Sequence, residues 1–161
     1  MRQILIAVGI LVLCSVFAAA DKKDDFKKAA SVNSPSCDLI PYDSINTSCR
    51  DAYRNQRDWC TGDRERGCAD LRKDDPKDRD TAKERRDNAA QCIENRKYVR
   101  SKFQDALSRL GSESSDPDPE IQALAKTLMQ KIQQSIDDHK GPLEETEKRR
   151  DKCDRLYNGR D

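Results

Sequence analysis

Cysteines carry the most distinctive chemistry of this sequence, because their number and spacing favour disulfide bonds. The chain holds seven cysteines, and one of them, Cys14, lies inside an apolar N-terminal stretch. Removal of that stretch leaves an even set, which is typical of the disulfide framework of an exported protein. The six that remain are Cys37, Cys49, Cys60, Cys68, Cys92 and Cys153.

Zinc binding is the alternative chemistry for a group of cysteines. The intervals between successive cysteines hold 11, 10, 7, 23 and 60 residues, so no pair has the short spacing of a zinc ligand pair. The only histidine, His139, stands apart from all of them. We therefore predict three structural disulfides, no metal site and no cofactor.

The pairing of the six cysteines is only partly constrained by geometry. Cys49 and Cys60 fall on one predicted helix, about 16 Å apart, which is too far for a disulfide between them. Cys153 must join the C-terminal helix to an earlier part of the chain, and we expect its partner to be Cys92 or Cys68. The remaining pairings stay open.

Acid–base catalysis is the chemistry that His139 would offer, because Asp137 and Asp138 precede it. A general base also needs an oriented partner, a pocket and a nucleophile, and no G-x-S-x-G motif occurs in the chain. A histidine near the C-terminus of a helix is favoured by the helix dipole without any catalytic role. We predict that the protein is not an enzyme.

An acidic group could in principle bind calcium. The segment that contains these acidic residues lacks the glycine and the closing glutamate of an EF-hand loop. It also lies at the start of a predicted helix, where acidic residues stabilise the N-terminus. The sequence therefore favours helix capping by Asp74, Asp75, Asp78 and Asp80.

Two further residues are candidates for surface roles. Asn46 begins the sequence Asn46-Thr47-Ser48, an N-glycosylation motif, and would carry a glycan in a eukaryotic secreted protein. Trp59 is the only tryptophan and could anchor a partner protein, since exposed tryptophans are frequent binding hot spots. Its position next to Cys60 also suits packing against a disulfide.

Residues 1–20 have the pattern of a signal peptide. Arg2 is followed by an apolar stretch of 14 residues, Ile4–Phe17, and then by the small residues Ala18 and Ala20. A membrane-spanning helix needs about 20 apolar residues. We predict cleavage after Ala20, secretion, and no membrane span in the mature chain.

The composition of the mature chain limits both its core and its partners. It has 30 basic and 30 acidic residues, so it has no net attraction to nucleic acid or to anionic membranes. Leu, Ile, Val and Phe supply only 18 of its 141 residues, about 13%, which is less than a usual globular core requires. Disulfides are expected to supply the missing stability.

The helical periodicities predict an all-α fold: a small disulfide-stapled helical bundle with a Cys-rich N-terminal helix and three longer antiparallel helices. Residues 21–36 are predicted to be a flexible polar arm, and 37–161 the disulfide-linked helical domain. Whether Lys22-Lys23 or Lys27-Lys28 in the arm are processed stays open. The Cys-rich helix is expected from Asp43 or Ser44 to about Thr61, and the longer ones over 75–110, 119–140 and 142–157.

Two faces of the long helices could contact partners. A thin heptad seam, which could pack within one chain or self-associate between two, comprises Ala82, Ala89, Arg96, Phe103 and Leu110. The face from Ile121 to Ile136 is the most apolar and could instead carry a lipid. We expect a secreted, non-enzymatic interaction protein with a charged helical surface and an extracellular protein as its partner. A small apolar-ligand carrier is the alternative.

Overall fold

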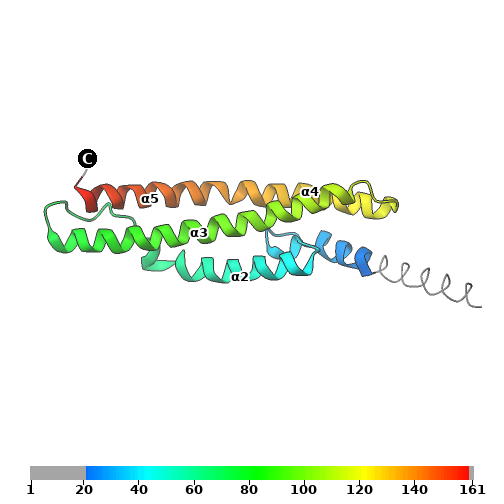
Figure 1. Ribbon diagram of the computed structural model, residues 1–161, viewed down its shortest axis with the longest axis horizontal. Coiled ribbons are helices and arrows are strands. Elements are labelled where there is room, and N and C mark those ends of the chain that lie inside the picture. Colours follow the sequence, from blue (N-terminus) through cyan, green and yellow to red (C-terminus); the bar gives the residue numbers. More distant parts are fainter. Residues whose placement is uncertain (1–20, 160–161) are drawn as a thin grey trace, which may run out of the picture.

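The computed structural model describes residues 21–159, apart from the side chains of Asp63 and Glu65. Within this range the chain is all-α and contains no strand, as predicted (Figure 1). No helix of the described part is long and apolar enough to cross a membrane. The predicted signal peptide lies outside the described residues. The elements are η1 (Cys37–Leu39), α2 (Asp43–Trp59), η2 (Gly62–Glu65), α3 (Pro76–Glu113), α4 (Pro119–Asp138) and α5 (Lys140–Asn158).

Helix α3 is the spine of the molecule. Its 38 residues extend about 57 Å, and Figure 1 shows α2 on one side of it and α4 with α5 on the other. Asp75 accepts a hydrogen bond from the backbone N–H of Lys77 and Pro76 occupies the first turn, so the predicted start is confirmed. The expected seam packs within the chain, because Ala82, Ala89 and Phe103 are buried.

Helices α4 and α5 follow one another in a single line and both run antiparallel to α3 (Figure 1). The predicted antiparallel packing therefore occurs between α3 and each of these two helices. The break falls at His139, three residues before Pro142. Proline removes the hydrogen bond to the carbonyl four residues earlier, at Asp138, and is tolerated in the first turn of the next helix.

The apolar core occupies the half of the bundle where α3 meets α4. Side chains of α3 such as Val99 and Phe103 pack there against Leu128 and Ile132 of α4. The other half contains only a small cluster around Cys68, Ala82 and Cys153. Two of the three disulfides lie in this second half, where hydrophobic burial is scarce.

Residues 21–30 form a helix that packs on the core, which corrects the prediction of a flexible arm over 21–36. Phe26 and Ala29 are buried, and the ring of Phe26 meets that of Tyr42 edge-on at 6.0 Å. The pKa of the Tyr42 hydroxyl is raised to about 12, chiefly because the side chain is buried. Lys131 of α4 donates to the carbonyls of Ala30 and Val32, at 2.6 and 2.7 Å, and so caps the end of this helix.

Ion pairs join the same helix to the end of α3, to the loop that follows it and to the start of α4. Lys22 contacts Glu113 at 2.5 Å and Asp116 at 2.6 Å, and Lys27 contacts Glu120 at 2.8 Å. Lys23 contacts Asp118 and Glu120. Three of the four lysines in the dibasic pairs therefore take part in tertiary contacts: Lys22, Lys23 and Lys27.

Candidate functional site

Every cysteine in the described range is in a disulfide. Cys37 pairs with Cys49, Cys60 with Cys92, and Cys68 with Cys153, with Cα–Cα distances of 5.7, 5.2 and 5.2 Å. Cys68 is one of the two partners predicted for Cys153. Cys14 lies outside the described residues. Among residues 21–159 no group of His, Cys, Asp and Glu side chains is arranged to hold a metal ion.

Two of these bridges fix the segment that follows α2. Cys60–Cys92 holds the end of α2 to α3, and Cys68–Cys153 holds the following loop to α5. Arg85 of α3 donates to the carbonyl of Gly67 at 2.7 Å and to the Asp70 carboxylate at 2.6 Å, which lowers the pKa of Asp70. The segment 60–70 is thus a rigid part of the surface.

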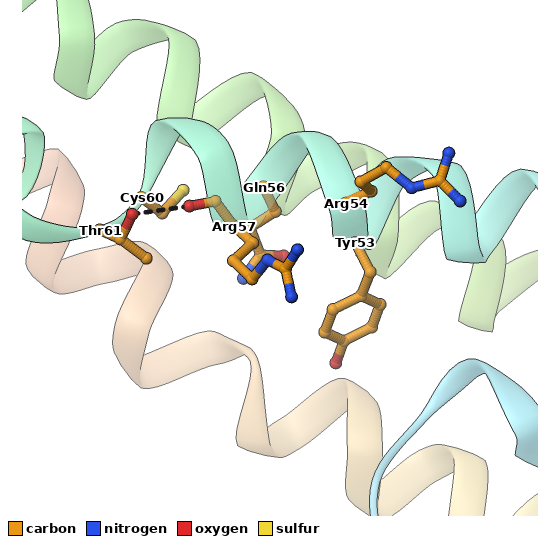
Figure 2. A pocket seen from close by; sticks show the side chains of 6 residues that line it. All are labelled: Tyr53, Arg54, Gln56, Arg57, Cys60 and Thr61. Carbon is orange, nitrogen blue, oxygen red and sulfur yellow. Dashed lines mark hydrogen bonds between the residues drawn. The ribbon is translucent and has the colours of Figure 1, made fainter.

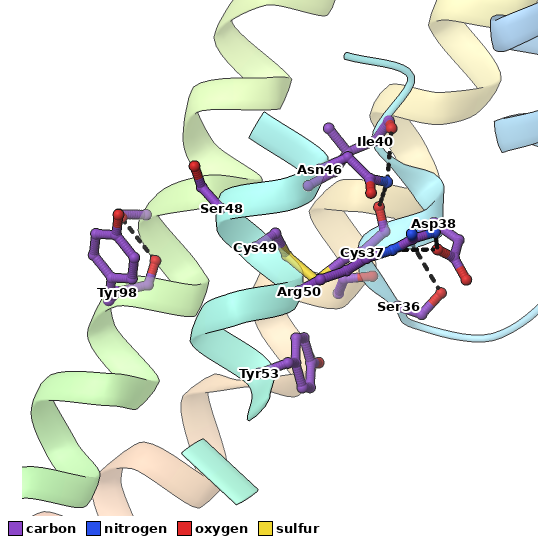
Figure 3. Close-up of a disulfide and its surroundings, with 12 residues drawn as sticks. Ser36, Cys37, Asp38, Ile40, Asn46, Ser48, Cys49, Arg50, Tyr53 and Tyr98 are labelled. Carbon is purple, nitrogen blue, oxygen red and sulfur yellow. Dashed lines mark hydrogen bonds and ion pairs between the residues drawn. A yellow bond between two sulfur atoms is a disulfide. The ribbon is translucent and has the colours of Figure 1, made fainter. Parts of the chain in front are cut away.

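The amide of Asn46 is used inside the fold. Its side-chain N–H groups donate to the carbonyls of Cys37 at 2.7 Å and Ile40 at 3.2 Å (Figure 3). These bonds connect the first turn of α2 to η1 beside the Cys37–Cys49 bridge. A glycan on this nitrogen would remove at least one of them, so the folded geometry does not support the predicted glycosylation of Asn46.

Trp59 is half-buried at the last turn of α2. The guanidinium of Arg64 lies over its ring, 4.7 Å from the centroid, in a cation–π contact. The candidate anchor is therefore partly covered by a cation, and its indole forms part of an arginine-rich surface.

His139 holds the α4–α5 junction against α2 and α3. Its Nδ1 lies 2.6 Å from the carbonyl oxygen of Ser135, and its Nε2 lies 2.6 Å from the hydroxyl of Tyr53. Since a carbonyl only accepts, Nδ1 carries the hydrogen, and in the neutral ring Nε2 accepts from Tyr53. The ring also contacts that of Phe103, with centroids 5.6 Å apart. These contacts give His139 a structural role in the fold.

Two of the four acidic residues around the start of α3 accept hydrogen bonds from backbone N–H groups. Besides Asp75, Asp78 accepts a hydrogen bond from the backbone N–H of Arg72 at 2.8 Å.

The apolar face of α4 is buried within the core of the protein. Its residues Ile121, Ala125, Leu128, Ile132 and Ile136 are at most 4% exposed. A lipid would have to displace other core side chains to reach them.

The surface of α2 presents a different feature, a hollow of about 490 Å³ near the end of the helix. Figure 2 shows its six lining residues, with Tyr53 and Arg57 projecting from the same side of α2. Burial raises the pKa of Tyr53, so its hydroxyl stays protonated at neutral pH. The hollow is lined by Tyr53, Arg54, Gln56, Arg57, Cys60 and Thr61.

Neighbouring hollows continue this one in both directions through shared residues. Tyr53 also lines a hollow of about 220 Å³ that reaches Pro35. In the other direction, Arg57 and Thr61 line a hollow that includes Arg64, and Arg64 in turn lines a small enclosed hollow between α3 and α5. Together the four form one connected band across the molecule.

Arginines dominate the described lining of this band, which we call the arginine track. In these four hollows no lysine is among the described lining residues, and the carboxylates are Asp38 and Asp58. An adjoining hollow that shares Asp38 and Arg50 adds Lys28, Asp25 and Asp43. The arginines are Arg50, Arg54, Arg57, Arg64, Arg66, Arg85 and Arg149. The charge of the chain is balanced as a whole but locally positive here.

The arginines at the α2 end of the track are available to a ligand. Arg50 contacts Asp38 at 2.5 Å and Arg54 contacts Asp51 at 3.7 Å, but all four side chains are more than half exposed. Exposed pairs of this kind contribute little and exchange readily. Arg57 makes no ion pair with any side chain in the described part of the chain. The sequence does not predict this track, because its first and last arginines are about a hundred positions apart in the chain. Only the folded structure brings them close together.

Comparison of the chain with protein-family models, with curated proteins and with solved structures finds no match.

Proposed function

We propose that this chain is a secreted, non-enzymatic binding protein that engages an anionic extracellular partner through the arginine track. The observation that carries the proposal is the connection of four hollows whose described lining contains seven arginines, two aspartates and no lysine. Guanidinium groups form bidentate hydrogen bonds with carboxylate, sulfate and phosphate oxygens. A fixed row of them selects partners that carry repeated negative charge.

The disulfides support both the compartment and the rigidity of this surface. Three bridges in a small helical protein fit an extracellular setting, where disulfides persist. The bridges from Cys60 and Cys68 hold the segment that carries Arg64 and Arg66 in place. A surface that is ordered before binding loses less conformational entropy when the partner arrives.

The environments of the reactive side chains support binding rather than catalysis. The described cysteines are bridged, His139 is held by two hydrogen bonds, and two acidic residues near the start of α3 accept hydrogen bonds from backbone N–H groups. Each of these groups has a structural partner. Five arginines of the track stay exposed: Arg50, Arg54, Arg57, Arg64 and Arg66.

The test captures partners from the extracellular fluid of the source on the immobilised mature protein. Three forms are compared: the wild type, Arg57→Gln/Arg64→Gln, and the charge-matched control Lys126→Gln/Lys148→Gln, whose exposed lysines lie outside the track. We expect a partner that the wild type and the control retain, that the arginine variant loses, and that high salt releases. Equal retention by all three forms contradicts the proposal.

A further inference from the structure

We propose that the arginine track binds a sulfated polysaccharide chain. This inference rests on the proposed function and names the chemical class of its partner. Three features of the track carry it: its length, the identity of its cations, and the hydrogen-bonding groups between them.

The length of the track fits a polymer rather than a small anion. The hollows follow α2, whose 17 residues extend about 25 Å, and reach Arg64 in the segment after it. The three hollows along α2 share Tyr53 and Arg57 as walls, so one ligand can contact all three. The hollow beside Cys153, of about 10 Å³, is too small to admit it. A single phosphate or sulfate ion would occupy only one of them.

The cations of the track suit sulfate groups. Arg50, Arg54 and Arg57 recur at i, i+4 and i+7, so they originate from one face of α2 over a length of about 10 Å. Asp51 and Asp58 fall roughly a quarter turn away on the helix. A sulfate ester keeps its charge at all physiological pH values and offers oxygens that accept from the guanidinium in pairs.

The groups between the arginines suit a sugar chain. Thr61 can both donate and accept, and the side-chain oxygen of Gln56 is buried without a hydrogen-bond partner in the described structure. When this amide turns toward the hollow, its oxygen can accept a hydrogen bond from a sugar hydroxyl. Sulfate groups for the arginines and hydroxyl groups for Gln56 occur together in a sulfated polysaccharide.

Competing polyanions match the track less well. Single-stranded nucleic acids need exposed aromatic rings on which bases stack, but Tyr53 is engaged by His139 and Trp59 is covered by Arg64. The exposed large hydrophobic residue found in the described range, Tyr98, does not line the track. An acidic peptide finds no strand edge within residues 21–159 to pair with.

The experiment measures the affinity of the mature, disulfide-bonded protein for a fluorescent heparin oligosaccharide by anisotropy. We expect saturable binding that weakens steeply between about 0.05 M and 0.5 M salt, as ion release requires. Arg57→Gln/Arg64→Gln should weaken binding about tenfold or more, whereas Lys126→Gln/Lys148→Gln should stay within about twofold. Unchanged helical circular dichroism and the absence of free thiols in both variants show that the fold is intact.

Three further probes decide the class of ligand. The chemically desulfated oligosaccharide should bind much more weakly, and equal binding overturns the inference. Tighter, arginine-dependent binding of polyglutamate or of single-stranded RNA also overturns it. Either result leaves the proposed function standing if partner capture still depends on Arg57 and Arg64. Loss of that dependence in the capture experiment removes the proposed function as well.

Discussion

Cys68 and Cys153 are joined across 85 positions of the chain, and their bond holds the loop after α2 to the last helix. Replacing both residues by serine should lower the free energy of unfolding by about 4 kcal/mol, because the unfolded chain regains the freedom of a long loop. The Cys37–Cys49 bridge closes only 12 positions and should contribute about 3 kcal/mol. Chemical denaturation of the two double-serine variants measures both values, and a larger loss at Cys37–Cys49 contradicts this ranking.

Phe26 should contribute strongly to stability although it lies in the segment that the sequence marks as a polar arm. Its side chain is 1% exposed, so Phe26→Ala should cost about 3 kcal/mol or more. Lys28→Ala, on the exposed face of the same helix, should change stability by less than about 0.5 kcal/mol. Equal stabilities of the two variants would show that residues 21–30 do not pack on the core.

Acid should release the helix over residues 21–30 before it affects α3. Hydrogen bonds from Lys22 and Lys23 lower the pKa values of Asp116 and Glu120 in the folded protein. Their ordinary values are about 3.9 and 4.3. The stabilisation is therefore complete above these values and is lost as the pH falls through the lower, folded-state values.

Hydrogen exchange measures this release directly. Relative to the intrinsic rates, amides in residues 22–30 should lose protection at about pH 3 compared with about pH 7, while those of the α3 core keep it. Lys22→Gln/Lys23→Gln should show reduced protection already at neutral pH. Protection that is independent of pH would mean that the ion pairs do not hold the helix.

Asn46 should be unmodified when the protein is produced through a eukaryotic secretory pathway, and it should stabilise the contact between η1 and α2. Asn46→Ala removes the donors to Cys37 and Ile40 and should cost about 1 to 3 kcal/mol. Ser48→Ala, which destroys the glycosylation motif but keeps both hydrogen bonds of Asn46, should change stability much less. Mass spectrometry of the protein produced by that route checks the modification, and a glycan on Asn46 would contradict this assignment.

The sequence predicts those parts of the fold that depend on local chemistry. The start of α3 follows from Asp75 before Pro76, and Asp75 accepts the expected capping bond. Asp118 makes the same kind of bond at the start of α4. Helix α5 ends before Gly159, which adopts a left-handed conformation with φ of 64° that glycine favours. The pairing of Cys153 could be narrowed to two candidates because it is isolated in the chain.

The features that the sequence does not predict depend on distant residues. The helix over residues 21–30 has few apolar side chains of its own, and its contacts with Asp116, Glu120 and Lys131 form only in the folded chain. The arginine track likewise combines residues of α2, α3, α5 and the loop after α2. In a chain with balanced charge, composition cannot reveal that the fold gathers arginines on one surface.

The most direct test of the arginine track compares heparin-oligosaccharide affinity between two variants that lose the same charge. Both Arg57→Gln/Arg64→Gln and Lys126→Gln/Lys148→Gln remove two positive charges, but only the first changes the track. The account predicts a loss of about tenfold or more for the arginine variant and near wild-type affinity for the lysine control. Equal affinities for the two variants would contradict it, because binding would then depend on total charge alone.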